Sequence, residues 1–371
     1  MSKYLLHCSP EELYQLVYKP LHDWMEVYGI SYPWSYPWSY SRTRNLPDSY
    51  AVWVSEVMLQ QTRVEHVRSY YSAWMQRWPS LAVFARAAEA EVLKQWEGLG
   101  YYSRALNMLA CARQCVDDQG RSELPTSFAE LRHLRGIGPY IAAAVASISG
   151  NEAVLALDTN VKRIFSRLYQ QPLSRSVESQ WQEQHRGALE LCDWRGHANL
   201  SWIQLGQQIC KSVKGRSASK MVGPDCSRCP LRGICPAAAK GNWNLFPRPK
   251  VYRRSLLQSR KLLLRAEGKY LLQRKTQGHL QHLWRFPDLQ QFEDLGGKAI
   301  LETRSLGRFS HSYLQTQEKI EVFSCESASS CCEWDEKLLS SEFEWLWAES
   351  FAEITVPGPY RRFLEAIGLN F

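Results

Sequence analysis

Four cysteines have the spacing that most directly predicts chemistry in this chain. Cys210 follows a helical stretch, and Cys226, Cys229 and Cys235 follow after gaps of fifteen, two and five residues. Thiolates at such spacing can bind a single metal centre, either an iron–sulfur cluster or zinc. Zinc sites usually pair two Cys-x-x-Cys units, whereas this run contains one, so the spacing favours iron–sulfur.

Two carboxylates are candidates for acid–base chemistry. Glu56 lies in the strongly apolar helical stretch Val52–Leu59, where it faces either solvent or a pocket. In a pocket, the loss of water would raise its pKa and make it a proton donor near neutral pH. Asp158 precedes a predicted helix, which it can cap and whose N-terminus favours its ionised form. Two such carboxylates suit cleavage of a glycosidic bond through an oxocarbenium-like state.

A short glycine motif, Gly136-Ile-Gly138, separates two predicted helices. The glycines allow a tight turn that points backbone N–H groups outward at the start of the following helix. Such a site can hold a phosphate without any side chain, although a Gly-x-Gly can also be a plain connector.

The elements that position these residues are helical from about Pro10 to Ala239. Apolar spacing and the Gly and Pro breaks predict helices in and around the 51–60 stretch and at Val64–Trp78, Ala88–Trp96, Ser103–Gln119, Ser127–Leu134, Tyr140–Ser149 and Thr159–Leu168. The tandem Tyr-Pro-Trp-Ser repeat at Ser31–Tyr40 cannot form a helix interior because of its prolines, and it predicts an expanded loop.

The character of the sequence changes at Gly241–Lys250, which is typical of a linker. Beyond it we predict strands, including Lys261–Arg265, Lys269–Gln273 and Lys319–Phe323. Helices are expected near Leu295–Ser305 and Tyr360–Gly368. These elements predict an α+β domain of about 120 residues.

The bulk properties restrict the class of protein. The 371 residues suffice for two domains, and the formal net charge of +8 suits a polyanionic partner. The cysteines are too scattered for a secreted disulfide scaffold. No apolar run approaches the roughly 20 residues that span a bilayer, and the N-terminal residues lack the apolar stretch of a signal peptide. We therefore expect a reduced, soluble, cytoplasmic protein, associated with the nucleoid if bacterial, with no membrane partner.

The chain resembles the adenine-specific mismatch glycosylases of the MutY family, in the helix-hairpin-helix superfamily. The resemblance covers nearly the whole length and is carried by four motifs, at Val52–Thr62, Gly98–Tyr102, Leu134–Tyr140 and Asp158–Arg163. It implies a mainly α helix-hairpin-helix glycosylase domain followed by an α+β Nudix-like domain. The implied boundaries are 1–240 for the glycosylase with its [4Fe–4S] loop at 210–235, 241–254 for a linker, and 255–371 for an 8-oxoguanine recognition domain.

The resemblance implies a monomeric DNA N-glycosylase of base excision repair that removes adenine opposite 8-oxoguanine or guanine. Adenine would be flipped out of the double-stranded DNA. Glu56 would protonate its N7, Asp158 would stabilise the oxocarbenium ion, and Tyr140 and Asn160 would support the reaction centre. Tyr140 stands where strand-cutting relatives carry a lysine that forms a Schiff base, so we expect a monofunctional enzyme.

The same resemblance implies the contacts with DNA. Gln61 and Thr62 would fill the gap in the duplex, and Leu99 with Tyr101 would wedge beside the opposing base. The backbone at Gly136 and Gly138 would bind phosphate. A loop made of three residues would read the opposing 8-oxoguanine: Phe309, Ser310 and His311.

The implied cofactor is a [4Fe–4S] cluster bound by Cys210, Cys226, Cys229 and Cys235. The stretch Asp294–Arg304 lacks the Glu-x-x-Glu-Glu cluster that a Nudix hydrolase needs to hold Mg²⁺, so recognition is expected there and not hydrolysis. Alternatives to the leading function are a strand-cutting pyrimidine-lesion glycosylase and a lesion-binding protein without catalysis.

Overall fold

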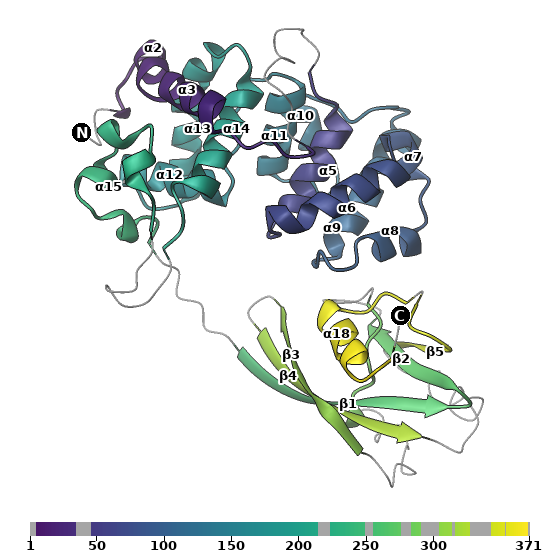
Figure 1. Cartoon of the computed structure of the whole chain (residues 1–371). Helices are drawn as coiled ribbons and strands as arrows, with labels where there is room; N and C mark the ends of the chain where they lie inside the picture. The colour runs from purple at the N-terminus through teal and green to yellow at the C-terminus, as the bar shows by residue number, and fades with distance from the viewer. Residues whose placement is uncertain are drawn as a thin grey trace. The chain divides into compact units, whose positions relative to one another are not determined.

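The structure, a computed structural model (Figure 1), describes residues 5–34, 46–213, 223–248, 255–275, 283–290, 304–313, 316–326, 343–352 and 354–369. The chain forms two compact units. The first comprises Met1–Arg86 and Asn107–Lys250, and the second comprises Ala87–Leu106 and Val251–Phe371.

The first unit is helical. Its helices and single helical turns are α2 (Pro10–Leu13), η1 (Tyr14–Tyr18), α3 (Lys19–Tyr28), α5 (Ser49–Leu59), α6 (Val64–Arg77), α7 (Leu81–Ala85), the larger part of α9 (Ser103–Arg113), η2 (Gln114–Asp118), α10 (Phe128–Leu131), α11 (Pro139–Ser149), α12 (Thr159–Tyr169), α13 (Arg175–Glu190), α14 (Arg195–Gln208), η4 (Cys226–Arg228), η5 (Arg232–Ile234), α15 (Pro236–Ala239) and η6 (Trp243–Leu245).

Two of these helices are buried on nearly all sides. In α5 every residue from Ser49 to Met58 is buried, and in α11 every residue from Ile141 to Ser149 is buried. A helix that is apolar all round must lie inside its domain. Helix α11 packs against both α5 and α14, so it connects the two halves of the unit.

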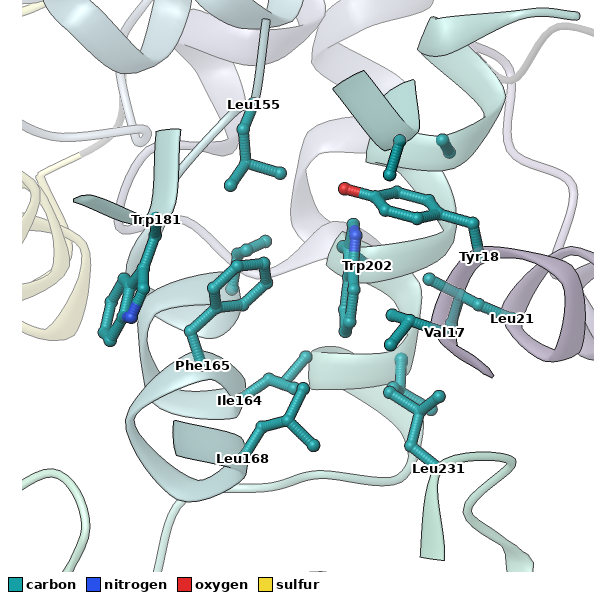
Figure 2. Close-up of a cluster of buried hydrophobic side chains, with 14 of the residues drawn as sticks. Val17, Tyr18, Leu21, Leu155, Ile164, Phe165, Leu168, Trp181, Trp202 and Leu231 are labelled. Atoms are coloured by element: carbon teal, nitrogen blue, oxygen red, sulfur yellow. The ribbon is translucent and has the colours of Figure 1, made fainter. Parts of the chain in front are cut away.

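A large apolar cluster lies between α3, α12, α13 and α14 (Figure 2). Phe165 of α12 lies between Trp181 of α13 and Trp202 of α14, with ring centroids 5.4 and 4.9 Å away. Tyr18 and Leu21 enter the cluster from the N-terminal helices. Burial of aromatic side chains on this scale fixes how the four helices pack.

The second unit contains a mixed five-stranded sheet with the order β3-β4-β1-β2-β5. Its elements are α8 (Glu89–Gln95), the start of α9, β1 (Ser255–Ala266), β2 (Lys269–Lys275), β3 (Arg304–Tyr313), β4 (Thr316–Glu326), β5 (Phe343–Ala348) and α18 (Gly358–Ala366). Strands β1 and β4 are parallel, and the other neighbouring pairs are antiparallel. Within this unit Arg361 of α18 pairs with Glu97 at 2.6 Å. This ion pair joins α18 to the residues just after α8.

Most of the predicted elements are confirmed. The helical stretches around 51–60, 64–78, 88–96, 103–119, 140–149, 159–168 and 360–368 correspond to helices, and α10 is shorter than the predicted 127–134. The three predicted strands lie within β1, β2 and β4. Residues 35–40 of the Tyr-Pro-Trp-Ser repeat lie outside the described residues.

The predicted helix at 295–305 is wrong at its end. Arg304 and Ser305 begin strand β3, where they pair with Ser324 and Phe323 of β4. A partner strand offers ladder hydrogen bonds that a local helical pattern does not reveal. Residues 294–303 lie outside the described residues. They include the rest of this predicted helix and most of the stretch that was compared with the Nudix glutamate cluster.

The predicted linker 241–254 is described up to residue 248. The turn η6 lies in this part, and the carbonyls of Trp243 and Phe246 both accept hydrogen bonds from Arg167 of α12. This stretch is therefore anchored on the first unit. In the described residues, none of the helices combines the length and the apolar character needed to cross a membrane.

Candidate active centre and cysteine pocket

Glu56 lies in the middle of helix α5. Asp48 caps this helix by accepting a hydrogen bond from the Ala51 N–H at 2.7 Å. The helix is apolar on all sides, so Glu56 is only 6% exposed, and the solvent-facing alternative is wrong. Burial raises the pKa of Glu56 to about 7, and the nearby charge of Asp158 acts in the same direction.

Tyr140 stands at the start of α11 and donates a hydrogen bond from its hydroxyl to Oε2 of Glu56 at 2.5 Å. This bond opposes the effect of burial on Glu56 because it favours the ionised carboxylate. The pKa of Tyr140 is raised well above its ordinary value by its own burial and by the charges of Glu56 and Asp158. Tyr140 is therefore a permanent donor to Glu56.

Asp158 caps helix α12, as its position predicts. Its Oδ1 accepts from the Val161 N–H at 2.6 Å and its Oδ2 from the Asn160 side-chain amide at 2.7 Å. These bonds lower its pKa, but burial acts more strongly and leaves the pKa of Asp158 raised. Glu56 with Tyr140 and Asp158 with Asn160 thus form two hydrogen-bonded pairs from α5, α11 and α12, and the charge of Asp158 acts on both members of the first pair.

The glycine motif before α11 uses its two glycines differently. Gly136 has a φ of +76°, and a Cβ there would lie 2.7 Å from Cβ of Asn107, so only glycine fits without a shift. Gly138 has a φ of −80° and is the N-cap residue of α11. The tight turn therefore depends on Gly136, and Gly138 leads into the helix N-terminus.

Arg163 is a residue of this site that the sequence patterns do not identify. Its Nη2 donates to Oδ1 of Asn160 at 3.0 Å and to the Gly206 carbonyl at 2.9 Å, and its Nε donates to the Cys210 carbonyl at 2.8 Å. It therefore connects the Asp158 group to the first cysteine of the metal-binding pattern. Its position at the end of the Asp158–Arg163 motif, one turn into an amphipathic helix, is the signal that could have indicated it.

The four cysteines of the predicted metal site line a single pocket of about 430 Å³, a volume that includes open solvent. None of the four forms a disulfide. Burial raises the pKa values of Cys226, Cys229 and Cys235, and the neighbouring sulfurs raise them further. Several sulfurs close together in an apolar pocket fit a metal centre, because a metal centre binds cysteines in their thiolate form and compensates for the loss of water around them.

Arg167, one helical turn after Arg163, contacts this pocket directly. It is 3% exposed, and its Nη1 lies 3.2 Å from Sγ of Cys210. Its other hydrogen bonds go to backbone carbonyls, so its charge is fixed beside the sulfur. The sequence does not indicate this role either, because a buried arginine is not apparent from a helical pattern.

Among the residues predicted to contact DNA, Gln61 and Tyr101 share an unusual backbone. Their φ values are 58° and 48°, in the left-handed region that residues other than glycine rarely adopt. Strain of this kind tends to occur at functional sites. Gln61 is exposed just after α5 and Thr62 is half-buried. Tyr101 is exposed, whereas Leu99 is only 5% exposed in this structure.

Phe309, Ser310 and His311 lie in strand β3, so their predicted position in a loop is wrong. They pair with β4 through Ile320, Lys319 and Glu318. The alternation of a strand buries the His311 side chain and packs Phe309 against Phe363 of α18, whereas Ser310 faces outward. Of the three residues, only Ser310 is exposed.

Trp34, one of the two tryptophans of the repeat, is buried against Tyr32 and Tyr71. Trp38 lies outside the described residues.

Residues 54–184 match the family described as HhH-GPD superfamily base excision DNA repair protein. An adenine DNA glycosylase of Arabidopsis thaliana is 32% identical over 308 residues, which cover 72% of this chain and 46% of that protein. The human adenine DNA glycosylase is 38% identical over 192 residues, 51% of this chain and 33% of that protein. The chain thus spans less than half the length of these relatives.

The solved structure of a thermostable thymine-DNA glycosylase is similar to this chain, with a TM-score of 0.50 and 19% sequence identity. The match covers 62% of this chain and 98% of that structure. This likeness supports the fold. Residues 54–184 are thus similar to the HhH-GPD superfamily of base excision DNA repair proteins, and the curated relatives named above are adenine DNA glycosylases.

Proposed function

We propose that this protein is a monofunctional DNA glycosylase that removes adenine mispaired with 8-oxoguanine or guanine. The observation that carries the proposal is the pair of carboxylates Glu56 and Asp158, which influence each other electrostatically and occupy different environments, with Tyr140 bonded to Glu56. The names of the curated relatives support adenine as the base.

Glu56 is the proposed proton donor. With a pKa of about 7, a large fraction of Glu56 carries its proton at neutral pH. Protonation at N7 of a flipped adenine neutralises the charge that builds on the departing base, so the base leaves more readily. The Tyr140 hydroxyl then stabilises the carboxylate that remains after the proton has moved.

Asp158 is the proposed partner of the cationic sugar. Its two oxygens are held by the Val161 N–H and the Asn160 amide, so the carboxylate keeps one orientation. A fixed anion stabilises positive charge that develops at the sugar without reorganising during the reaction. Arg163 holds the Asn160 carbonyl and thereby keeps its amide turned toward Asp158.

A strand-cutting reaction would need an amine as nucleophile. Tyr140 offers a hydroxyl whose pKa is raised and which is already bound to Glu56. The amine nearest in sequence to Asp158, Lys162, pairs instead with Glu178 of α13 at 2.7 Å. We therefore propose an abasic site as the product.

The four cysteines are the proposed ligands of a [4Fe–4S] cluster. In mononuclear zinc sites the sulfurs bind at about 2.3 Å and so lie within about 4 Å of one another. The one group of potential ligands within 4.8 Å of one another in the described part of the chain does not include these cysteines. Sulfur spacing wider than in a zinc site fits a cluster better than a single ion. When bound, it would supply a rigid scaffold for the loop 210–235.

Double-stranded DNA with the mispair is the proposed partner of a monomer. Gln61, Thr62, Leu99, Tyr101 and the hairpin at Gly136 are the proposed contacts. The buried position of Leu99 would require its loop to open on the duplex. In the proposed Nudix-like domain, exposed Ser310 is the residue proposed to read 8-oxoguanine.

The experiment that tests this function is single-turnover cleavage of a duplex with one adenine opposite 8-oxoguanine, with and without hot alkali. We expect strand breaks after alkali only. Breaks without alkali would contradict the monofunctional mechanism, and tight binding without product would favour a lesion-binding protein. Guanine in place of 8-oxoguanine measures the preference between mispairs. Glu183→Gln, a change of an exposed glutamate on α13, serves as the matched control for variants of Glu56.

A further inference from the structure

We propose that His22, Glu26 and His197 form a binding site for a divalent transition metal, with zinc as the best match. His22 and Glu26 lie one turn apart on α3 and so share a face of that helix. His197 lies in the first turn of α14. None of the three belongs to the candidate active centre or to the cysteine pocket, so the proposal does not depend on the function proposed above.

The two imidazoles are already placed as a pair of metal ligands would be. Their Nδ1 atoms are 3.2 Å apart. Two nitrogen ligands bound to tetrahedral zinc at 2.0–2.1 Å lie about 3.3 Å from each other. An ion could therefore replace the hydrogen bond between the rings with little movement of either helix.

Glu26 completes the arrangement from the other side of His197. Its Oε1 lies 3.2 Å from Nε2 of His197. Metal-bound histidines usually donate their second N–H to a carboxylate, which fixes the tautomer and the ring orientation. With Nε2–H directed at Glu26, the Nδ1 lone pair of His197 faces His22. In the described part of the chain, donor atoms of these three residues all lie within 4.8 Å of one another.

The site is accessible to an ion. His22 and His197 line an open pocket of about 390 Å³, a volume that includes solvent at its mouth, together with Tyr14, Cys192 and Asp193. Water in this pocket can fill the remaining coordination positions. Two imidazoles completed by water suit zinc and its neighbours, whereas Mg²⁺ and Ca²⁺ prefer ligand sets made of oxygen.

A bound ion would fasten the N-terminal helix to the interior of the unit. Leu21, next to His22, and Trp202 of α14 both belong to the apolar cluster of Figure 2. An ion between His22 and His197 therefore spans two helices that this cluster already brings together. Since the unfolded chain does not keep these residues close, the ion stabilises the folded protein as its concentration exceeds its Kd.

The test is metal binding by the full-length protein with its cysteine pocket loaded, so that the four thiols of that pocket do not compete. Co²⁺ is added as a spectroscopic probe and is then displaced by Zn²⁺, while the absorbance of the iron–sulfur cluster serves to check its integrity. We expect one additional saturable ion, with a cobalt spectrum of nitrogen and oxygen ligands. His22→Gln should weaken binding at least about tenfold, and Glu26→Gln about 10- to 100-fold, the range for partners of metal-bound histidines.

His66→Gln, a change of an exposed histidine on α6, is the matched control and should bind as the wild type does. Zn²⁺ should raise the Tm of the wild type and of this control, and should leave the Tm of His22→Gln unchanged. Thermal unfolding without metal verifies that each variant is folded. Equal affinity in the wild type and both site variants, or the lack of a saturable ion in the wild type, would overturn the proposal. Release of adenine is a separate readout.

Discussion

The interior of α5 and the N-terminus of α12 place the same chemical group, a carboxylate, in two different surroundings. Inside α5 the backbone N–H groups are used by the helix, so among the described residues the donor to Glu56 is the side chain of Tyr140. At the start of α12 the N–H of Val161 is available to Asp158, and Asn160 adds a second donor. The backbone itself thus decides how well each anion is solvated.

This difference separates the two roles. Burial affects both groups, but at Glu56 it takes the pKa to about 7, whereas at Asp158 hydrogen bonds from the backbone of Val161 and from the side chain and backbone of Asn160, together with the charge of Arg163, oppose it. A carboxyl that can keep its proton near neutral pH suits proton donation, and a carboxylate held by N–H donors suits stabilisation of a cation. Changes at either position test whether this separation is real.

The largest effect is expected from Glu56→Gln, which keeps the size of the side chain but removes the proton it can donate. The rate of adenine release should fall by about 10²- to 10⁴-fold, the usual contribution of a general acid. Single-turnover kinetics at pH 7 measure it, with Glu183→Gln as the control. A variant as fast as the wild type would remove Glu56 from the mechanism.

Asp158→Asn removes the negative charge and keeps a side chain that can still cap α12. We expect release of adenine to slow by about 10²- to 10³-fold, since a preorganised electrostatic contact is lost, while the Tm changes little because Asn is also a good N-cap. Asp48→Asn is the matched control, because Asp48 caps α5 in the same way. If Asp158→Asn lost stability and kept its rate, Asp158 would be only a cap.

The two carboxylates also differ in how well the sequence predicts them. Capping is local, because Asp158 and the Val161 N–H are three positions apart, so the sequence alone predicts it. The burial of Glu56 depends on α11, which begins more than eighty residues later, and the apolar pattern of α5 leaves both of its orientations open. The family resemblance places Tyr140 at the reaction centre, but neither it nor the spacing predicts the bond from Tyr140 to Glu56.

The errors have the same cause. The sequence does not predict strand β3 at Arg304 and Ser305, and it places Phe309–His311 in a loop, because pairing with β4 is a contact between segments. Arg163 and Arg167 of α12 both contact Cys210, which follows more than forty residues later, so their role depends on a contact between distant segments. Helical periods and cysteine spacing are local patterns, so they can be recognised in the sequence. Contacts between residues that are distant in the chain cannot be recognised in this way.

A third test concerns stability and uses the raised pKa of Glu56. Because its folded pKa of about 7 exceeds the ordinary value of 4.5, its protonated form favours folding. Its contribution is fully present below about pH 4.5 and is lost as the pH rises through 7. The loss amounts to about 3 kcal/mol at pH 8.

Glu56→Gln should therefore be more stable than the wild type at pH 8, by several degrees in Tm, and most of this gain should disappear at pH 5. Thermal unfolding at the two pH values measures it, and Glu183→Gln should show no such dependence. A Tm of Glu56→Gln that is lower than that of the wild type at pH 8 would mean that the ionised carboxylate is well solvated in the folded protein.

The smallest effect is expected from Tyr140→Phe, which sharpens the comparison because it removes the side-chain donor that α11 supplies to Glu56. The bond favours the ionised form of Glu56, so its loss should raise the pKa of Glu56 further. Since the proton donor then keeps its proton at higher pH, the alkaline limb of the pH profile of kcat/KM should move to higher pH. The rate at pH 7 should change by about tenfold or less, the value of one hydrogen bond of roughly 1 kcal/mol.

Tyr50→Phe is the control for the loss of a buried hydroxyl. Tyr50 lies on α5, as Glu56 does, but its hydroxyl bonds to the Trp78 carbonyl and not to Glu56. It should leave the alkaline limb in place. A limb that moves to lower pH in Tyr140→Phe would mean that the hydroxyl favours the protonated carboxyl. Glu56 would then depend on Tyr140 to keep its proton, and the contrast with Asp158 would arise from the side chain of Tyr140 and not from the backbone of α5.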